Sequence, residues 1–254
     1  MKMTKLLKLW GSALVVLSTP LFAAPAATPK TVSKNEVSAE ALALAKLMSP
    51  RDIRIDAELK QFDQNFVKTL LQEDGAKELE ADYPGLTAAM AKAVRPIVAA
   101  ETARIIDQAY PAIAKVLATD LTGEEIAELT AYYGSPAGKN LLRQTANSID
   151  ASDVYTQAAK NQRVTEESAA AQAFMAGIQA TAQISDTDRQ ALKALTERPV
   201  YAKLQMVQPK ILKIILDASN APDPAYEKRI EEAMSAAVEA HVNAASAKSG
   251  ETSK

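Results

Sequence analysis

Three neighbouring glutamates are the first candidates for acid–base chemistry. Glu124, Glu125 and Glu128 follow Thr122 closely in the chain. Two carboxylates can act as general acid and general base when burial separates their pKa values. However, Thr122 and Glu125 have the spacing of a helix capping box, and acidic residues in a first turn stabilise the helix dipole. We therefore interpret this segment as a solvent-exposed helix start and not as a catalytic pair.

The nearest approximation to a serine nucleophile with a base is Ser135 with Lys139, four residues later. Such a pair shares one face of a helix. Because Ser135 directly precedes Pro136, we interpret the serine as the N-cap of a helix that starts with proline. Gly134 and Gly138 lie between two predicted helices, whereas a phosphate-binding loop needs a strand before it. The sequence therefore predicts neither a serine hydrolase nor a nucleotide site.

The chain has a single histidine, His241, and no cysteine. Disulfides, thiolate sites and histidine-based metal centres are therefore excluded. Glu231 and Glu232 precede His241 by more than two helical turns, so one helix cannot bring them together. We expect His241 on the surface near a helix C-terminus, where a protonated imidazole is favoured. These observations predict a protein without cofactor, metal or enzymatic activity.

Residues 1–23 have the pattern of a secretory signal peptide. Lys2, Lys5 and Lys8 precede a mostly apolar run over residues 9–22, and small residues follow. The apolar run is shorter than the roughly 20 residues that span a membrane. We predict cleavage after Ala23 or a few residues later, export to the periplasm of a Gram-negative host, and no membrane segment in the mature chain. Residues 24–35 are polar and small, and we expect them to be disordered.

The rest of the sequence indicates an all-α fold. Alanine, the strongest helix former, is frequent throughout, and the glycines fall largely at predicted helix ends. Ser33 with Glu36 suggests a capping box, and Ser49 suggests a cap for a helix starting at Pro50. Helices are expected over residues 36–48, 50–73, 86–116 with kinks or breaks at Pro96 and Pro111, 122–133, 136 onward, 152–183, 184–196, 199–219 and 223–245.

Two helical halves are expected to pack together into a multi-helix bundle without a sheet. The first covers residues 36–149, and a C-terminal region covers residues 150–246, followed by a disordered tail over residues 247–254. A shift of 63 residues aligns Thr122 with Ser185 and Pro136 with Pro199. This alignment suggests a degenerate internal repeat, although any two capped helix pairs in an alanine-rich chain match to a similar extent.

The segment from Leu121 to Lys139 carries a more specific pattern, in which a threonine-capped acidic helix leads into two aromatic residues and then Ser-Pro-x-Gly. The positions are Thr122, Glu125, Tyr132, Tyr133, Ser135, Pro136 and Gly138. The pattern resembles that of a bacterial family, domain of unknown function 2059, over about residues 36–149. That family more often has phenylalanine at the first aromatic position. The resemblance implies an exported helical protein with no established activity and no catalytic residues to transfer.

The physical properties of the motif residues indicate a structural role. Gly138 permits two helices to approach closely, Ser135 and Pro136 set the corner, and the two tyrosines supply apolar area. We therefore expect these residues to have a structural role.

The functional expectation is a non-enzymatic binding or scaffolding factor of the cell envelope, whose amphipathic helices accept a partner protein. The alternative is a carrier that encloses an apolar ligand such as a fatty acyl chain among Phe174, Met175, Met206 and Ile211. A hydrolase would require a buried acid pair that the sequence does not reveal. The net charge of -2 gives no reason to expect a nucleic-acid partner, and the oligomeric state stays open.

Overall fold

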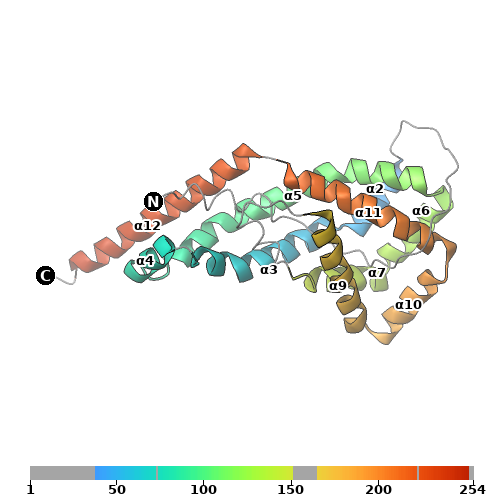
Figure 1. The fold of residues 1–254 in the computed structure, drawn as a ribbon, viewed down its shortest axis with the longest axis horizontal. Coiled ribbons are helices and arrows are strands. Elements are labelled where there is room, and N and C mark those ends of the chain that lie inside the picture. The colour runs from blue at the N-terminus through green and yellow to red at the C-terminus, as the bar shows by residue number, and fades with distance from the viewer. Residues whose placement is uncertain (1–37, 73, 151–164, 222, 252–254) are drawn as a thin grey trace.

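A computed structural model describes residues 38–72, 74–150, 165–221 and 223–251 (Figure 1). The predicted signal peptide, the lead-in and residues 152–164 of the helix predicted over residues 152–183 lie outside these ranges. Within them the chain forms helices and no strand, which confirms the all-α prediction. The helices are α2 (Ala39–Met48), α3 (Arg51–Leu70), α4 (Asp74–Asp82), α5 (Leu86–Asp120), α6 (Gly123–Gly134), α7 (Pro136–Asn147), α9 (Glu166–Gln183), α10 (Asp186–Thr196), α11 (Pro199–Asn220) and α12 (Pro224–Glu251).

Helix α5 is the central element, and Figure 1 shows it running along most of the molecule. Helices α2, α3, α11 and α12 all pack against it. Ion pairs give the direction of the last two helices, because Lys210 of α11 contacts Asp120 and Arg229 of α12 contacts Glu101. The chain therefore returns along α5 from its C-terminal end towards its N-terminal end. Among the described residues, no helix is long and apolar enough to cross a membrane.

The prolines of α5 do not divide it, so of the two predicted outcomes, a kink or a break, the break is wrong. Pro96 and Pro111 both lie inside one continuous helix, and both are exposed. A proline in a helix leaves the carbonyl four residues earlier without its usual donor. On an exposed face, water can hydrogen-bond to such a carbonyl, while the buried face of α5 keeps its packing. The cost of each proline is therefore small enough for the core contacts of α5 to offset it.

The starts of the first two described helices differ in detail from the prediction. Helix α2 begins at Ala39, because the Ser38 hydroxyl accepts a hydrogen bond of 3.1 Å from the Ala41 N–H and caps it there, while the capping box predicted for Ser33 and Glu36 lies outside the described residues. The Ser49 hydroxyl does not cap the next helix. It accepts a hydrogen bond of 3.1 Å from Arg54 Nε instead, and Pro50 stands at the N-cap position with Arg51 as the first helical residue.

Two further stretches are more helical than expected. Asp74 and Gly75 were expected to stop a helix, but they begin α4 after α3 has ended at Leu70. At the other end, α12 continues to Glu251, so residues 247–251 of the predicted tail are helical. In both stretches, helix-favouring residues such as alanine, glutamate and lysine outweigh an isolated glycine or a polar composition.

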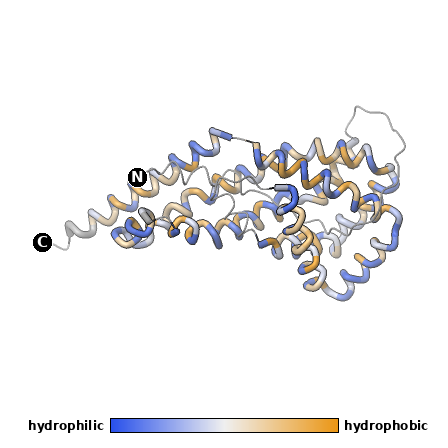
Figure 2. The backbone as a smooth tube through the Cα atoms, viewed as in Figure 1, coloured by the Kyte–Doolittle hydropathy of each residue, from blue (hydrophilic) through white to orange (hydrophobic). Residues whose placement is uncertain are grey.

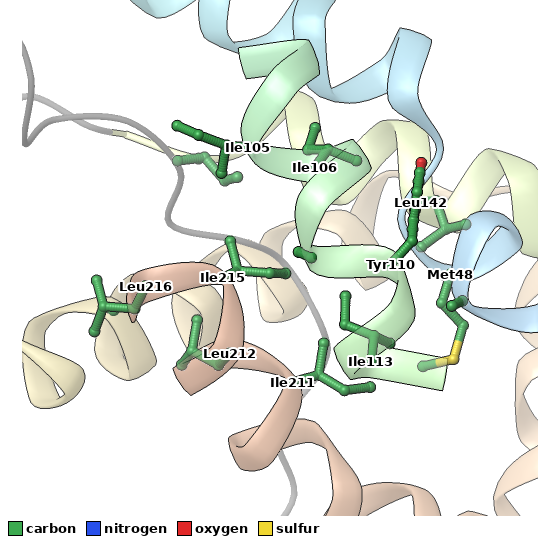
Figure 3. Packing of buried hydrophobic residues seen from close by; sticks show 14 of the residues in the cluster. Met48, Ile105, Ile106, Tyr110, Ile113, Leu142, Ile211, Leu212, Ile215 and Leu216 are labelled. Carbon is green, nitrogen blue, oxygen red and sulfur yellow. The ribbon is translucent and has the colours of Figure 1, made fainter. Parts of the chain in front are cut away.

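The main core contains residues from both predicted halves, from Ala41 of α2 to Met234 of α12. Figure 3 shows Ile113 of α5 beside Ile211 of α11, and both belong to this core. The long C-terminal helices thus complete the core around α5. A smaller apolar cluster joins α7, α9 and α10. It consists of Leu141, Ala180, Ile184 and Leu192.

Candidate functional site

The motif from Thr122 to Gly138 forms the corner between α6 and α7. Thr122 Oγ1 accepts a hydrogen bond from the Glu125 N–H (3.3 Å), and Glu125 Oε2 accepts one from the Thr122 N–H (2.8 Å), which completes the predicted capping box. Ser135 Oγ accepts from the Gly138 N–H (3.1 Å) and donates to the Tyr132 carbonyl (2.6 Å). Pro136 occupies the first turn of α7. Both helix starts therefore form as local sequence signals predict.

Gly138 lies against the backbone of α6. A Cβ atom at this position would stand 2.3 Å from the Tyr132 carbonyl oxygen and 2.7 Å from Tyr133 Cα. These atoms belong to the main chain and cannot rotate away as a side chain would. The close approach of α6 and α7 therefore requires glycine at this position.

The two tyrosines of the motif join the two apolar clusters. Their rings meet edge to face, with centroids 5.3 Å apart and planes at 78°. Tyr133 is buried in the main core, while Tyr132 packs against both clusters. Burial raises the pKa of Tyr132 to about 12, so its hydroxyl is neutral at physiological pH. That buried hydroxyl has no hydrogen-bond partner among the described residues, and the ring packs between the two clusters.

The glutamates of α6 do not form an acid pair, but two of them are less exposed than predicted. Glu124 is exposed, whereas the side chains of Glu125 and Glu128 retain only 18% and 30% of their accessible surface. Glu125 pairs with Lys203 of α11 at 2.7 Å, and Glu128 pairs with Arg198 at 2.6 Å. The capped helix start is therefore also a contact with the C-terminal region.

Partial burial by itself would raise the pKa of Glu125, but hydrogen bonds from Lys203 and from the Thr122 N–H outweigh it and lower the pKa below the usual 4.5. A carboxyl group with a lowered folded-state pKa stabilises the protein above its unfolded-state pKa, and this contribution disappears as the pH falls through the folded-state pKa.

We expect Glu125→Gln to lower the free energy of unfolding by about 1 kcal/mol at pH 7, because glutamine keeps the cap but loses the charge that faces Lys203. Parent and variant should converge in stability at a pH below the folded-state pKa of Glu125, where the parent is also neutral. Urea denaturation at a series of pH values measures both effects. A difference that stays constant as the pH falls would contradict the role of the charge. Glu124→Gln, at an exposed position, is the matched control.

The remaining candidates are separate from one another in the structure. His241 is half-buried, and its Nε2 lies 3.2 Å from the Pro84 carbonyl oxygen. Glu231 is exposed, and Glu232 pairs with Lys228 of its own helix. Lys139 is also exposed, away from the capping role of Ser135. Over the described part of the chain, no three histidine, aspartate or glutamate side chains gather as a metal site would require.

Helix α9 has an unusual distribution of side chains. Its buried positions are small residues that pack against α7 and α11, namely Ala169, Ala173, Ala176, Gly177 and Ala180. Its large apolar residues point outward instead: Phe174 is 39%, Met175 53% and Ile178 44% exposed. In Figure 2 hydrophilic colour is confined mainly to the start of this helix, whereas neighbouring α10 is mostly blue. The side of the helix that carries these large apolar residues therefore faces solvent.

We call the exposed residues Ala171, Phe174, Met175, Ile178 and Ala182 the α9 face. They recur at three to four positions and form one continuous stripe along the helix. No residue from Ser168 to Ser185 carries a charge. Exposed apolar residues at single positions are common on folded proteins, whereas here they form one contiguous uncharged stripe.

A polar groove of about 590 Å³ adjoins the α9 face. Its lining comes from α3, from α9, and from the end of α7 together with the residues that follow α7. Six side-chain amides line it, along with three charged side chains: Gln61, Gln64, Asn65, Asn147, Gln179 and Gln183, and Lys60, Lys68 and Asp150. We call this feature the amide groove. Gln179 and Gln183 follow Ile178 and Ala182 in the sequence, so the groove and the α9 face share one edge of the helix.

Sequence reasoning did not identify the amide groove, because its residues come from three separate helices. Part of the signal was present in the sequence, since the run from Ser168 to Ser185 lacks charge although it has helical periodicity. A surface helix normally carries charges on its outer side. Their absence distinguishes this helix from α10, which begins with Asp186 and Asp188.

A protein-family model matches the part of the chain that contains the motif. Residues 107–166 match the family described as an uncharacterized protein conserved in bacteria, domain of unknown function 2059. The matched region starts at residue 107 and not at residue 36, and it extends beyond residue 150. It contains the whole motif from Thr122 to Gly138, which confirms the partial resemblance expected from those residues. No curated protein and no solved structure matches the chain.

Proposed function

We propose that this protein is an exported, non-enzymatic binding factor of the cell envelope and that it binds a partner protein through the α9 face. The observation that carries the proposal is the outward orientation of Phe174, Met175 and Ile178 on a helix whose inner side consists of small residues. Removing such a stripe from water is a favourable contribution to association.

Export is supported by the sequence of residues 1–23, in which lysines precede an apolar run and small residues follow. A non-enzymatic role is supported by the arrangement of the candidate groups. Glu125 and Glu128 form ion pairs with Lys203 and Arg198. Ser135 is engaged as a helix cap, and His241 packs against a turn. None of these groups faces another in the way that acid–base or nucleophilic catalysis requires.

The carrier alternative is less well supported. It required Phe174, Met175, Met206 and Ile211 to enclose one apolar space. Phe174 and Met175 point to solvent, while Ile211 is buried in the core against α5. These residues therefore occupy different surfaces of the bundle, and the groove beside them is polar.

Site-specific photo-crosslinking in the bacterial periplasm tests the proposal. A photoreactive amino acid at Met175 should form adducts with another protein, and the same amino acid at Gln190, an exposed position on α10, is the matched control. We expect adducts at Met175 at least about tenfold above the control. The sequence of the recovered N-terminus should begin after Ala23 or a few residues later.

Two results would contradict the proposed function. Equal adducts at Met175 and Gln190 would show that the α9 face has no preferred partner. Recovery of the protein with residues 1–23 still attached would contradict export through a cleaved signal peptide.

A further inference from the structure

We propose that Met175 is a site of reversible oxidation, at which peroxide converts the thioether to a sulfoxide and makes the α9 face polar. The consequence for binding rests on the proposed function, because Met175 lies within the surface assigned to the partner. Differences in burial among the methionines make the reaction selective. The position of Met175 along α9 determines what the reaction changes.

Methionine is the sulfur-containing residue of this chain, because the sequence contains no cysteine. No thiol of the same chain therefore competes for an oxidant. Met48, Met90 and Met234 are only 3%, 4% and 4% exposed, and Met206 is half-buried. Met175 is 53% exposed, which makes it the most accessible methionine in the described part of the chain.

Hydrogen peroxide oxidises a thioether by transferring one oxygen atom. The sulfur lone pair attacks one peroxide oxygen, a sulfur–oxygen bond forms, and the oxygen–oxygen bond breaks. The departing hydroxide takes the proton of the transferred oxygen and becomes water, so sulfur loses two electrons and peroxide gains two. The oxidant must reach the sulfur, which a close-packed core prevents. Methionine sulfoxide reductases reverse the change with a dithiol, which leaves a disulfide and water.

Oxidation at this position changes the chemistry of the α9 face. Met175 stands next to Phe174 and one helical turn from both Ala171 and Ile178. No residue from Ser168 to Ser185 is charged, so these apolar side chains determine the character of the surface. A sulfoxide adds a polar oxygen, and burying that oxygen in an apolar contact without a donor is unfavourable. The modified face should therefore bind an apolar partner surface less tightly.

The same oxidation leaves the fold unchanged. The inner side of α9 consists of small residues that pack against α7 and α11, and Met175 belongs to neither apolar cluster. A sulfoxide at Met48 or Met90 would instead place an unpaired polar oxygen in the core. Burial thus separates a surface modification at Met175 from damage that would unfold the protein.

Peroxide treatment of the purified protein, followed by peptide mass spectrometry, tests the selectivity. We expect Met175 to be oxidised at least about tenfold faster than Met48, Met90 and Met234 in the folded protein, because the core excludes the oxidant. In urea, where burial is lost, the four rates should become similar. Equal rates in the folded protein would overturn the inference.

Hydrophobic-interaction chromatography tests the change in the α9 face without a partner. The oxidised protein should elute earlier than the parent, and treatment with the two methionine sulfoxide reductases, one for each sulfoxide epimer, should restore its retention. Met175→Leu is the matched control, because leucine keeps the apolar surface and lacks the sulfur. A retention that peroxide leaves unchanged, or alters equally in Met175→Leu, would overturn the inference. Circular dichroism should show unchanged helix content.

Crosslinking in cells tests the consequence for the partner. With the photoreactive amino acid at Ile178, peroxide should reduce adducts at least about threefold in the parent and not in Met175→Leu. If adducts form and peroxide reduces them in neither protein, or equally in both, the inference fails and the proposed function stands. If adducts at Ile178 do not exceed those at Gln190 while Met175 is oxidised selectively, the proposed function fails and the oxidation site stands.

Discussion

Replacement of Gly138 with alanine is expected to lower the free energy of unfolding by about 3 kcal/mol, which is large for the addition of one methyl group. The added Cβ would stand 2.3 Å from the Tyr132 carbonyl oxygen and 2.7 Å from Tyr133 Cα. Because both contacts are with main-chain atoms of α6, relief requires α6 and α7 to move apart. That movement would disturb the Ser135 cap and the packing of both tyrosines.

Urea denaturation followed by circular dichroism at 222 nm, the usual helix signal, measures this effect. Gly123→Ala is the matched control, because no atom lies within 4 Å of its added Cβ and the residue lies in the first turn of α6. Alanine there should be neutral or stabilise the protein by up to about 1 kcal/mol through a less flexible unfolded chain. Similar stabilities for Gly138→Ala and the parent protein would contradict the close contact between α6 and α7.

The same corner illustrates what local sequence predicts well. The capping box at Thr122 and the serine–proline start at Ser135 depend on residues within one turn of each other, so their spacing in the sequence already defines the hydrogen bonds. The role of Gly138 also follows from its place directly after that corner. For these residues, sequence and structure give the same architecture.

Features that depend on distant contacts could not be predicted in this way. The sequence predicts a helix around Phe174 and Ile178, but it does not indicate whether the side with large residues or the side with small residues turns inward. In α9 the alanine side allows closer packing against α7, and the large residues remain outside. The continuity of α5 through Pro96 depends likewise on which face its neighbours leave exposed. The amide groove forms only where residues of three helices come together, so no local sequence pattern predicts it.

No sequence pattern predicted the charge cluster around the buried Glu101, beside α12. The Glu101 side chain is only 4% exposed and pairs with Arg104 and with Arg229. Arg104 Nε donates to Glu101 Oε2 at 2.9 Å, while the Arg229 guanidinium lies 3.5 Å from the same oxygen. Arg104 also lies 3.8 Å from Asp223, whose carboxylate accepts hydrogen bonds from the first turn of α12. The cluster therefore fixes the start of α12 on α5.

Glu101→Gln is expected to lower the free energy of unfolding by about 2 kcal/mol. Glutamine has nearly the same shape, but it removes the charge between two guanidinium groups and turns an NH₂ donor towards other donors. The full cost of a buried, broken ion pair would be larger, but Arg104 is 35% and Arg229 46% exposed, so water screens both arginines. Thermal or urea unfolding measures the difference, and hydrogen exchange should rise first in α12.

Asp63→Asn provides the matched comparison, because Asp63 and Arg95 form an ion pair of 3.2 Å in which both side chains are 49% exposed. An exposed pair of this kind contributes little, so the change in stability should stay within about 0.5 kcal/mol. Equal effects of Glu101→Gln and Asp63→Asn would contradict a special role for burial. Faster exchange spread evenly over all helices would show that Glu101 stabilises the whole bundle and does not fix α12 in particular. Selective exchange in α12 would instead confirm that this helix is held to α5 mainly at the charge cluster.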